Sequence, residues 1–170
     1  MLTVKYQDGF LNIYPVTQND REEILEVYKQ CEDFLALGPV ATASVEMVLA
    51  DLEISRDIGG RFCGIHAPDG KMIGVIDYVP NNYRGENGAA YLSLLMISLP
   101  YRNLGIGVVV VRAVEDEIKK DESVTVIWAG VQVNNPKAIR FWQRMGYRIA
   151  SEPKLYPDQT TAVDLRKDIR

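Results

Sequence analysis

The sequence contains little of what builds disulfide scaffolds or metal centres. Its 170 residues include two cysteines, Cys31 and Cys63, and one histidine, His66, and no Cys-x-x-Cys spacing occurs. Neither a disulfide framework nor a metal site is therefore expected, and few cysteines fit a cytoplasmic location. We interpret both cysteines as small buried apolar residues, and His66, close to a predicted hairpin turn, as a surface residue.

Long apolar runs and an excess of positive charge are also missing. No apolar stretch approaches the ~18 residues of a membrane span, and the N-terminus lacks the basic segment and apolar core of a signal peptide. The net charge is −4, whereas a nucleic-acid-binding surface is basic. We therefore expect neither a membrane nor a nucleic-acid partner, and a negative charge suits a cationic amine substrate.

The composition that remains is typical of a soluble globular protein. Apolar residues make up 47% and charged residues 25% of the chain, and no repeat or linker interrupts it, which predicts a single domain over residues 1–170. Strands are predicted over 10–16, 61–67, 72–79, 89–98, 124–133, 147–150 and 161–166, and helices over 20–37, 45–58, 104–120 and 136–145. This order predicts a mixed sheet of six to seven strands flanked by about four helices.

One segment has the layout of a phosphate-binding loop. A predicted strand ends near Pro100, and the sequence Arg102-Asn103-Leu104-Gly105-Ile106-Gly107 then opens a helix. Glycines let the backbone approach an anion closely, and the first N–H groups of the helix and Arg102 add positive charge. Two other phosphate loops are excluded, because Val110 replaces the third glycine of Gly-x-Gly-x-x-Gly and no Gly-Lys-Ser/Thr occurs. The alternative interpretation is a tight turn between strand and helix.

A second segment predicts a short capped helix. Asn135 is a favoured N-cap residue, Pro136 suits the first helical position, and Gly146 suits the residue after the end. Five residues at helical spacing form its apolar face: Ala138, Ile139, Phe141, Trp142 and Met145.

Together the two segments resemble the signatures of the GNAT superfamily of acetyl-coenzyme A–dependent N-acetyltransferases. The first reads Arg-x-x-Gly-x-Gly, and the second reads Asn-x-x-Ala-x-x-Phe-aromatic-x-x-x-Gly-aromatic, ending at Tyr147. The resemblance implies the fold of that family, whose sheet splays open after its long central strand so that acetyl-coenzyme A enters the gap. It also implies that the coenzyme contacts Leu95, Met96, Ile97, Arg102, Asn103, Leu104, Gly105, Ile106, Gly107, Val108, Asn135, Phe141 and Trp142.

The catalytic groups are less clearly marked. By resemblance, acetyl passes directly to an amine, which must first lose a proton to a base, and the backbone N–H of Ile97 stabilises the developing oxyanion. Many relatives carry a tyrosine as proton donor where this chain has Trp142, whose indole has no useful acidity. Either the thiolate leaves as such and water protonates it, or another group is the donor, for which the candidates are Tyr101, Tyr147 and Tyr156.

The base is open as well. Tyr91 stands about where some relatives carry a glutamate, and Tyr91 and Ser93 alternate on one face of a predicted strand, so either can line the acceptor side. A neutral phenol is a poor base. The carboxylates that can face the cleft are Glu32, Asp33 and Asp77, each of which we interpret as a solvated surface charge.

The sequence thus predicts an N-acetyltransferase that acts on a primary amine of a small molecule or peptide, with a second copy of the chain as a possible partner. One alternative is a coenzyme A–binding regulatory module with little or no catalysis, which Trp142 and the lack of a carboxylate on the central strand favour. The other is an acyltransferase of the same fold that uses a longer acyl chain or a hydroxyl acceptor.

Overall fold

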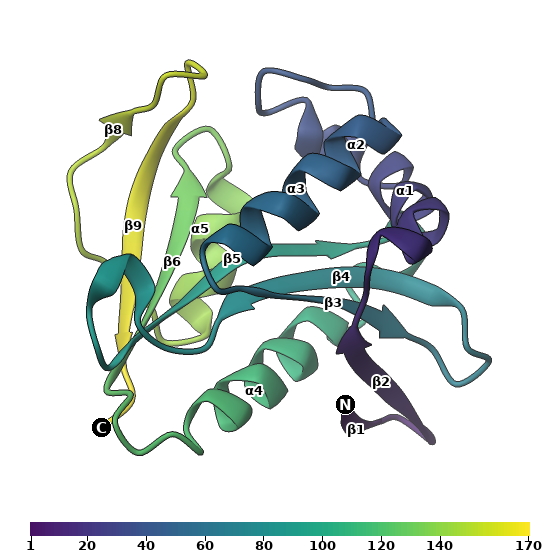
Figure 1. The fold of residues 1–170 in the computed structure, drawn as a ribbon, viewed down its shortest axis with the longest axis horizontal. Coiled ribbons are helices and arrows are strands. Elements are labelled where there is room, and N and C mark those ends of the chain that lie inside the picture. Colours follow the sequence, from purple (N-terminus) through teal and green to yellow (C-terminus); the bar gives the residue numbers. More distant parts are fainter.

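The computed structural model describes residues 1–170 and contains a nine-stranded mixed sheet with helices on both faces (Figure 1). Neighbouring strands are antiparallel, except that the β5–β6 pair is parallel. In spatial order the strands are β1 (Leu2–Tyr6), β2 (Gly9–Pro15), β3 (Arg61–His66), β4 (Met72–Val79), β5 (Ala89–Ile97), β6 (Val126–Gln132), β9 (Thr161–Asp168) and β7 (Arg148–Ile149), and β8 (Lys154–Leu155) also pairs with β9.

Two apolar cores lie on opposite faces of this sheet. Helices α4 (Ile106–Ile118) and α5 (Pro136–Arg144) contribute to the larger core, whereas α1 (Arg21–Lys29) and α3 (Val45–Asp57) contribute to the smaller one, with α2 (Glu32–Leu35) packed against it. We therefore refer to the α4/α5 face and the α1–α3 face. No helix of the protein combines the length and the apolar character that crossing a membrane requires.

The predicted fold class is confirmed, with three local differences. Strand β1 was not predicted, although Leu2, Val4 and Tyr6 alternate with polar residues, and it adds an edge that contacts α4. Strand β8 has only two residues, too few for a periodic signal. The first predicted helix is divided into α1 and α2, because the backbone of Cys31 leaves the helical region with φ −120° and ψ 18°.

The predicted opening of the sheet is confirmed and follows from the strand pairing. Strands β5 and β6 pair only from Ala89 to Leu92 and from Val126 to Ala129, after which each strand continues without the other. A β-bulge lies at this point, since Asp77 is opposite Leu94 and Tyr78 is opposite Leu92, leaving Ser93 as the extra residue.

His66 and the two cysteines are all buried. Both cysteines are buried and free, as predicted. The interpretation of His66 as a surface residue is wrong, because its side chain is only 4% exposed and stacks on Tyr14 at 4.1 Å between ring centroids. His66 belongs to β3 rather than to the turn, and the neighbouring strand β2 covers it.

Candidate functional site

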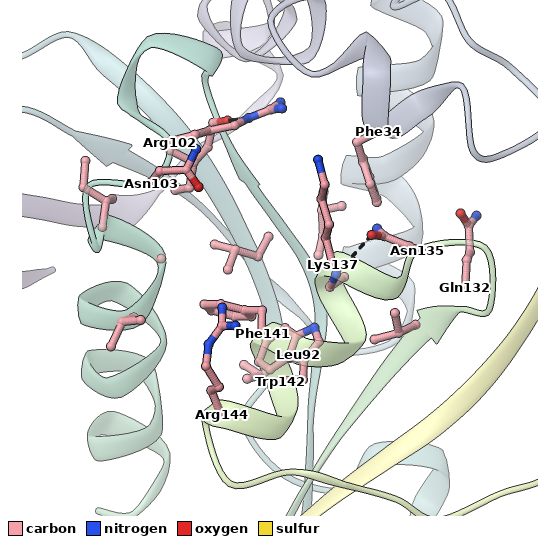
Figure 2. A pocket seen from close by; sticks show the side chains of 18 of the residues that line it. Phe34, Leu92, Arg102, Asn103, Gln132, Asn135, Lys137, Phe141, Trp142 and Arg144 are labelled. Carbon is pink, nitrogen blue, oxygen red and sulfur yellow. Dashed lines mark hydrogen bonds between the residues drawn. The ribbon is translucent and has the colours of Figure 1, made fainter.

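The gap between β5 and β6 holds a cavity of about 690 Å³. Figure 2 shows Arg102 and Asn103 on one wall and the α5 residues Phe141 and Trp142 on another, with Phe34 of α2 near Asn135. The lining consists of Phe34, Leu92, Ser93, Leu94, Leu95, Ile97, Tyr101, Arg102, Asn103, Gly105, Ile106, Gly107, Val108, Gly130, Val131, Gln132, Asn135, Lys137, Ala138, Phe141, Trp142 and Arg144.

Most of the predicted coenzyme contacts lie in this lining, and only Met96 and Leu104 do not. Met96 is 3% exposed because its side chain points into the core under α1 and α3. Leu104 is 51% exposed at the outside of the loop. Its carbonyl accepts a hydrogen bond from the hydroxyl of Tyr6 at 2.7 Å, so the unpredicted strand β1 holds the loop in place.

The loop before α4 forms a cradle of unpaired backbone donors. Gly105 is the N-cap residue with φ +81°, a left-handed conformation that glycine adopts without strain. Its carbonyl accepts from the N–H of Val109 at 3.2 Å, so the three N–H groups from Ile106 to Val108 have no partner within the helix. A Cβ atom added at Gly105 would meet no atom within 4 Å. Free donors, open space and the positive end of the helix dipole fit a phosphate group.

Arg102 departs from the expectation that its side chain faces a phosphate. Its guanidinium forms a bidentate pair with Asp33 at 2.6 and 3.0 Å and also donates to the carbonyls of Gln30 and Ile97. It therefore fastens α1 and α2 to the end of β5, and its charge is largely neutralised by Asp33. Two other cationic residues of the lining, Lys137 and Arg144, supply positive charge to the cavity.

The backbone of Ile97 is oriented as an oxyanion donor must be. Opposed residues of an antiparallel pair alternate between bonded and non-bonded positions. Because the N–H of Ser98 bonds to the carbonyl of Ile73 at 2.9 Å, the next pair, Ile97 and Gly74, is a non-bonded one. The N–H of Ile97 thus points away from β4, toward the side on which β6 has separated.

Helix α5 has the predicted cap and an aromatic wall. The side chain of Asn135 accepts from the N–H of Ala138 at 3.1 Å. Trp142 is 7% exposed and meets Phe141 and Tyr147 edge to face at 5.2 and 5.1 Å between centroids. Trp142 therefore serves as a packed apolar side of the cavity.

The tyrosines differ in their access to the cavity. Tyr101 lines it, whereas Tyr156 follows β8 outside it. Tyr147 is buried and donates to the Glu115 carboxylate at 2.9 Å, and burial raises its pKa. Tyr91 stacks on Tyr83 with centroids 4.1 Å apart, and burial raises its pKa as well, so Tyr91 stays a neutral phenol and not a base.

The three candidate carboxylates differ in exposure and in their hydrogen-bond partners. Asp33 is largely exposed, and Arg102 lowers its pKa. Glu32 is half-buried and accepts from the N–H of Ala43 at 2.9 Å. The interpretation of Asp77 as a surface charge is wrong, because it is 5% exposed beneath α3, where Ser55 donates to its carboxylate at 2.6 Å.

The split mixed sheet and the donor cradle beside it are the features expected of an acyltransferase that takes its acyl group from a phosphate-bearing carrier. The chain belongs to the acetyltransferase (GNAT) family, whose model matches residues 19–147. It is 34% identical over 161 residues to N-alpha-acetyltransferase 50 of Danio rerio, a match that covers 93% of this chain and 77% of that protein.

Solved structures agree on the fold. An acetyltransferase from Thermus thermophilus superposes with a TM-score of 0.76 at 24% identity, covering 99% of this chain and 100% of that one. The putative acetyltransferase yncA from Salmonella typhimurium, solved with acetyl-CoA, superposes with a TM-score of 0.66 at 16% identity over 94% of each chain. The protein is thus an acyltransferase of a family that uses acetyl-CoA.

Proposed function

We propose that this protein transfers the acetyl group of acetyl-CoA to the α-amino group at the N-terminus of a peptide or protein. The observation that carries this proposal is that one cavity reaches both faces of the sheet. Leu95 and Val108 line it from the α4/α5 face, whereas Leu94 and Phe34 line it from the α1–α3 face. A donor and an acceptor can therefore approach Ile97 from opposite sides.

The residues present fit acetyl-CoA, which when bound supplies the acetyl group as a reactive thioester. The N–H groups of Ile106 to Val108 would hold its diphosphate, and Lys137 and Arg144 would attract the negative charge. Asn135 and Phe141 line the path toward Ile97, whose N–H would stabilise negative charge on the reacting carbonyl oxygen. The unpaired donors and the open space at the loop support the assignment of the diphosphate.

Two observations support a peptide α-amine as the acceptor. The 34% identical relative is named an N-alpha-acetyltransferase, and its alignment covers most of this chain. In addition, the side chain of Asn134 donates to the carbonyl of Leu37 at 3.0 Å, which ties the loop between α2 and α3 to the rim formed by Gln132 and Asn135. A rim fixed in this way on one side suits an extended chain end.

The test measures thiol release from acetyl-CoA with matched acceptors. We expect release with a peptide that has a free N-terminus and one internal lysine, and none after its N-terminus is blocked. Thiol release with the blocked peptide as acceptor, or with a polyamine but not with the free peptide, would overturn the α-amine assignment. Binding of coenzyme A without release on any amine would instead favour the regulatory module, and faster turnover of longer acyl thioesters would favour the other acyltransferase.

A further inference from the structure

We propose that Asp77 is the proton acceptor for the amine and that it acts through the hydroxyl of Ser93, which lines the cavity. This inference rests on the proposed function, since it needs an amine acceptor that arrives as a cation. Asp77 itself does not line the cavity. It is a positioning residue that receives the proton through Ser93.

The relay is built at the β-bulge where the sheet divides. Ser93 is the extra, half-buried residue of the bulge, and its hydroxyl donates to Oδ2 of Asp77 at 2.5 Å. The other carboxylate oxygen of Asp77, Oδ1, accepts from the hydroxyl of Ser55 in α3 at 2.6 Å. The hydroxyl of Ser93 thus connects a buried carboxylate with the space in which the acceptor would bind.

Two carboxylates are hydrogen-bonded to side chains of the lining, one to a cationic partner and the other to neutral partners. Asp33 is bonded to Arg102, whose guanidinium lowers the carboxyl pKa, and it is largely exposed. A carboxylate paired in this way is a weak base. Asp77 is bonded to the neutral hydroxyls of Ser93 and Ser55 instead, so its negative charge is not offset by a cation.

The surroundings of Asp77 shift the pKa of its carboxyl group upward. Burial raises its pKa above the usual carboxyl value, and the hydrogen bonds from Ser55 and Ser93 offset only part of that rise. The titratable groups that face it are Asp51 on α3, Tyr28 on α1 and Cys63 on β3. None of the three brings positive charge, and the charge of Asp77 in turn raises the pKa of Asp51. A base is most effective when its pKa lies near the working pH, so a raised carboxyl pKa suits proton removal.

Protons and bonds balance in the transfer step. The ammonium gives one proton to the oxygen of Ser93 while the hydroxyl proton of Ser93 passes to Oδ2 of Asp77. The freed amine forms the new C–N bond at the acetyl carbonyl, and the C–S bond breaks. The second proton lost by the nitrogen goes to the leaving sulfur, and Asp77 later returns its proton to water. One proton is released per acetyl group transferred.

The experiment measures kcat against pH for a peptide with a free α-amine at saturating acetyl-CoA. For the unmodified protein we expect an acid limb, the fall of kcat at low pH, whose midpoint lies at a lower pH than the pKa of the acceptor amine. That pKa is about 7.7–8.0 for an α-amino group. For Asp77→Asn we expect kcat at pH 7 to fall by about 10²-fold or more, the usual range for general-base help. Its acid limb should then follow the pKa of whichever acceptor is used.

Two further variants separate a relay from a structural role. Ser93→Ala removes the connection and should resemble Asp77→Asn. Ser55→Ala removes a hydrogen bond that favours the charged form, so it should move the acid limb to higher pH while the plateau stays near its original height. A carboxyl NMR titration of the free protein should show the same upward shift for Asp77. Asp116→Asn, on an exposed carboxylate of α4, is the matched control and should change neither quantity.

The outcomes are distinguishable. If the unmodified protein acetylates no amine, the proposed function fails and the relay fails with it. If the unmodified protein is active, and the Asp77→Asn variant folds and keeps the original kcat and its original dependence on pH, the relay alone is overturned. A lower kcat with an unchanged pH profile in Asp77→Asn and Ser93→Ala would also overturn it, because it would show a structural role.

Discussion

Gly107→Asp should separate the stability of the fold from its affinity for coenzyme A. Gly107 occupies the second position of α4, where the helix dipole favours a negative side chain by about 0.3–1 kcal/mol. A Cβ atom there would lie 3.5 Å from the ring of Phe141, which is ordinary contact, and Asp is only about 0.3 kcal/mol better than glycine in helix propensity. The free energy of unfolding should therefore stay constant or rise by up to about 1 kcal/mol.

The same carboxylate should oppose binding of the diphosphate. Two negative charges about 5 Å from it each cost about 0.8 kcal/mol even at the dielectric constant of water, and more in a partly enclosed cavity. Together they cost about 1.7 kcal/mol before screening by salt, which corresponds to a loss in affinity of roughly 20-fold. The positive end of the helix dipole attracts the Asp side chain and the diphosphate alike. The substitution should therefore favour folding and weaken binding of coenzyme A.

Calorimetric titration with coenzyme A and denaturant melts measure the two quantities. Gly107→Asn, of nearly equal size and without charge, should lose less affinity than Gly107→Asp, and the difference should shrink at high salt. Acetylated pantetheine, which lacks the diphosphate, should be used equally well by both variants. Unchanged coenzyme A affinity in folded Gly107→Asp would refute the assignment of this loop as the diphosphate cradle.

Three further predictions concern single side chains. Trp142→Ala should lower the free energy of unfolding by about 3–5 kcal/mol, since it empties a site that is 7% exposed, and a loss below about 1 kcal/mol in denaturant melts would contradict its role as a packed wall. Asn135→Ala should cost about 1 kcal/mol as a lost N-cap, whereas Asn135→Ser should keep the cap and raise the KM for acetyl-CoA, and an unchanged KM would remove the ligand role. Asp77 has a raised pKa in the folded state, so its ionisation makes stability fall as the pH rises from the ordinary carboxyl range through the folded pKa. The free energy of unfolding of Asp77→Asn minus that of the unmodified protein should therefore be larger at pH 8 than at pH 4. Denaturant melts in which this difference is larger at pH 4 would contradict the sign.

Local sequence signals account for much of the fold and part of the site. Asn135 and Pro136 begin α5 because their backbone preferences are local, and the apolar spacing of α4 outweighs the strand propensity of its valines. The resemblance of two ordered signatures to one family then predicted the division of the sheet. Strand β1 was within reach of the same reasoning, since Leu2–Tyr6 alternates and Asp8-Gly9 marks a turn.

The sequence by itself therefore determined the family, the order of most elements and the glycine loop before α4, because each depends on residues within a few positions of one another. The tertiary structure alone decided which charges are buried and which are paired. Arg102 meets Asp33 across 69 positions of the chain, and Asp77 is covered by Ser55 of α3, 22 positions away. Hydrophobic periodicity describes one element at a time, whereas burial and ion pairing depend on elements that only folding brings together.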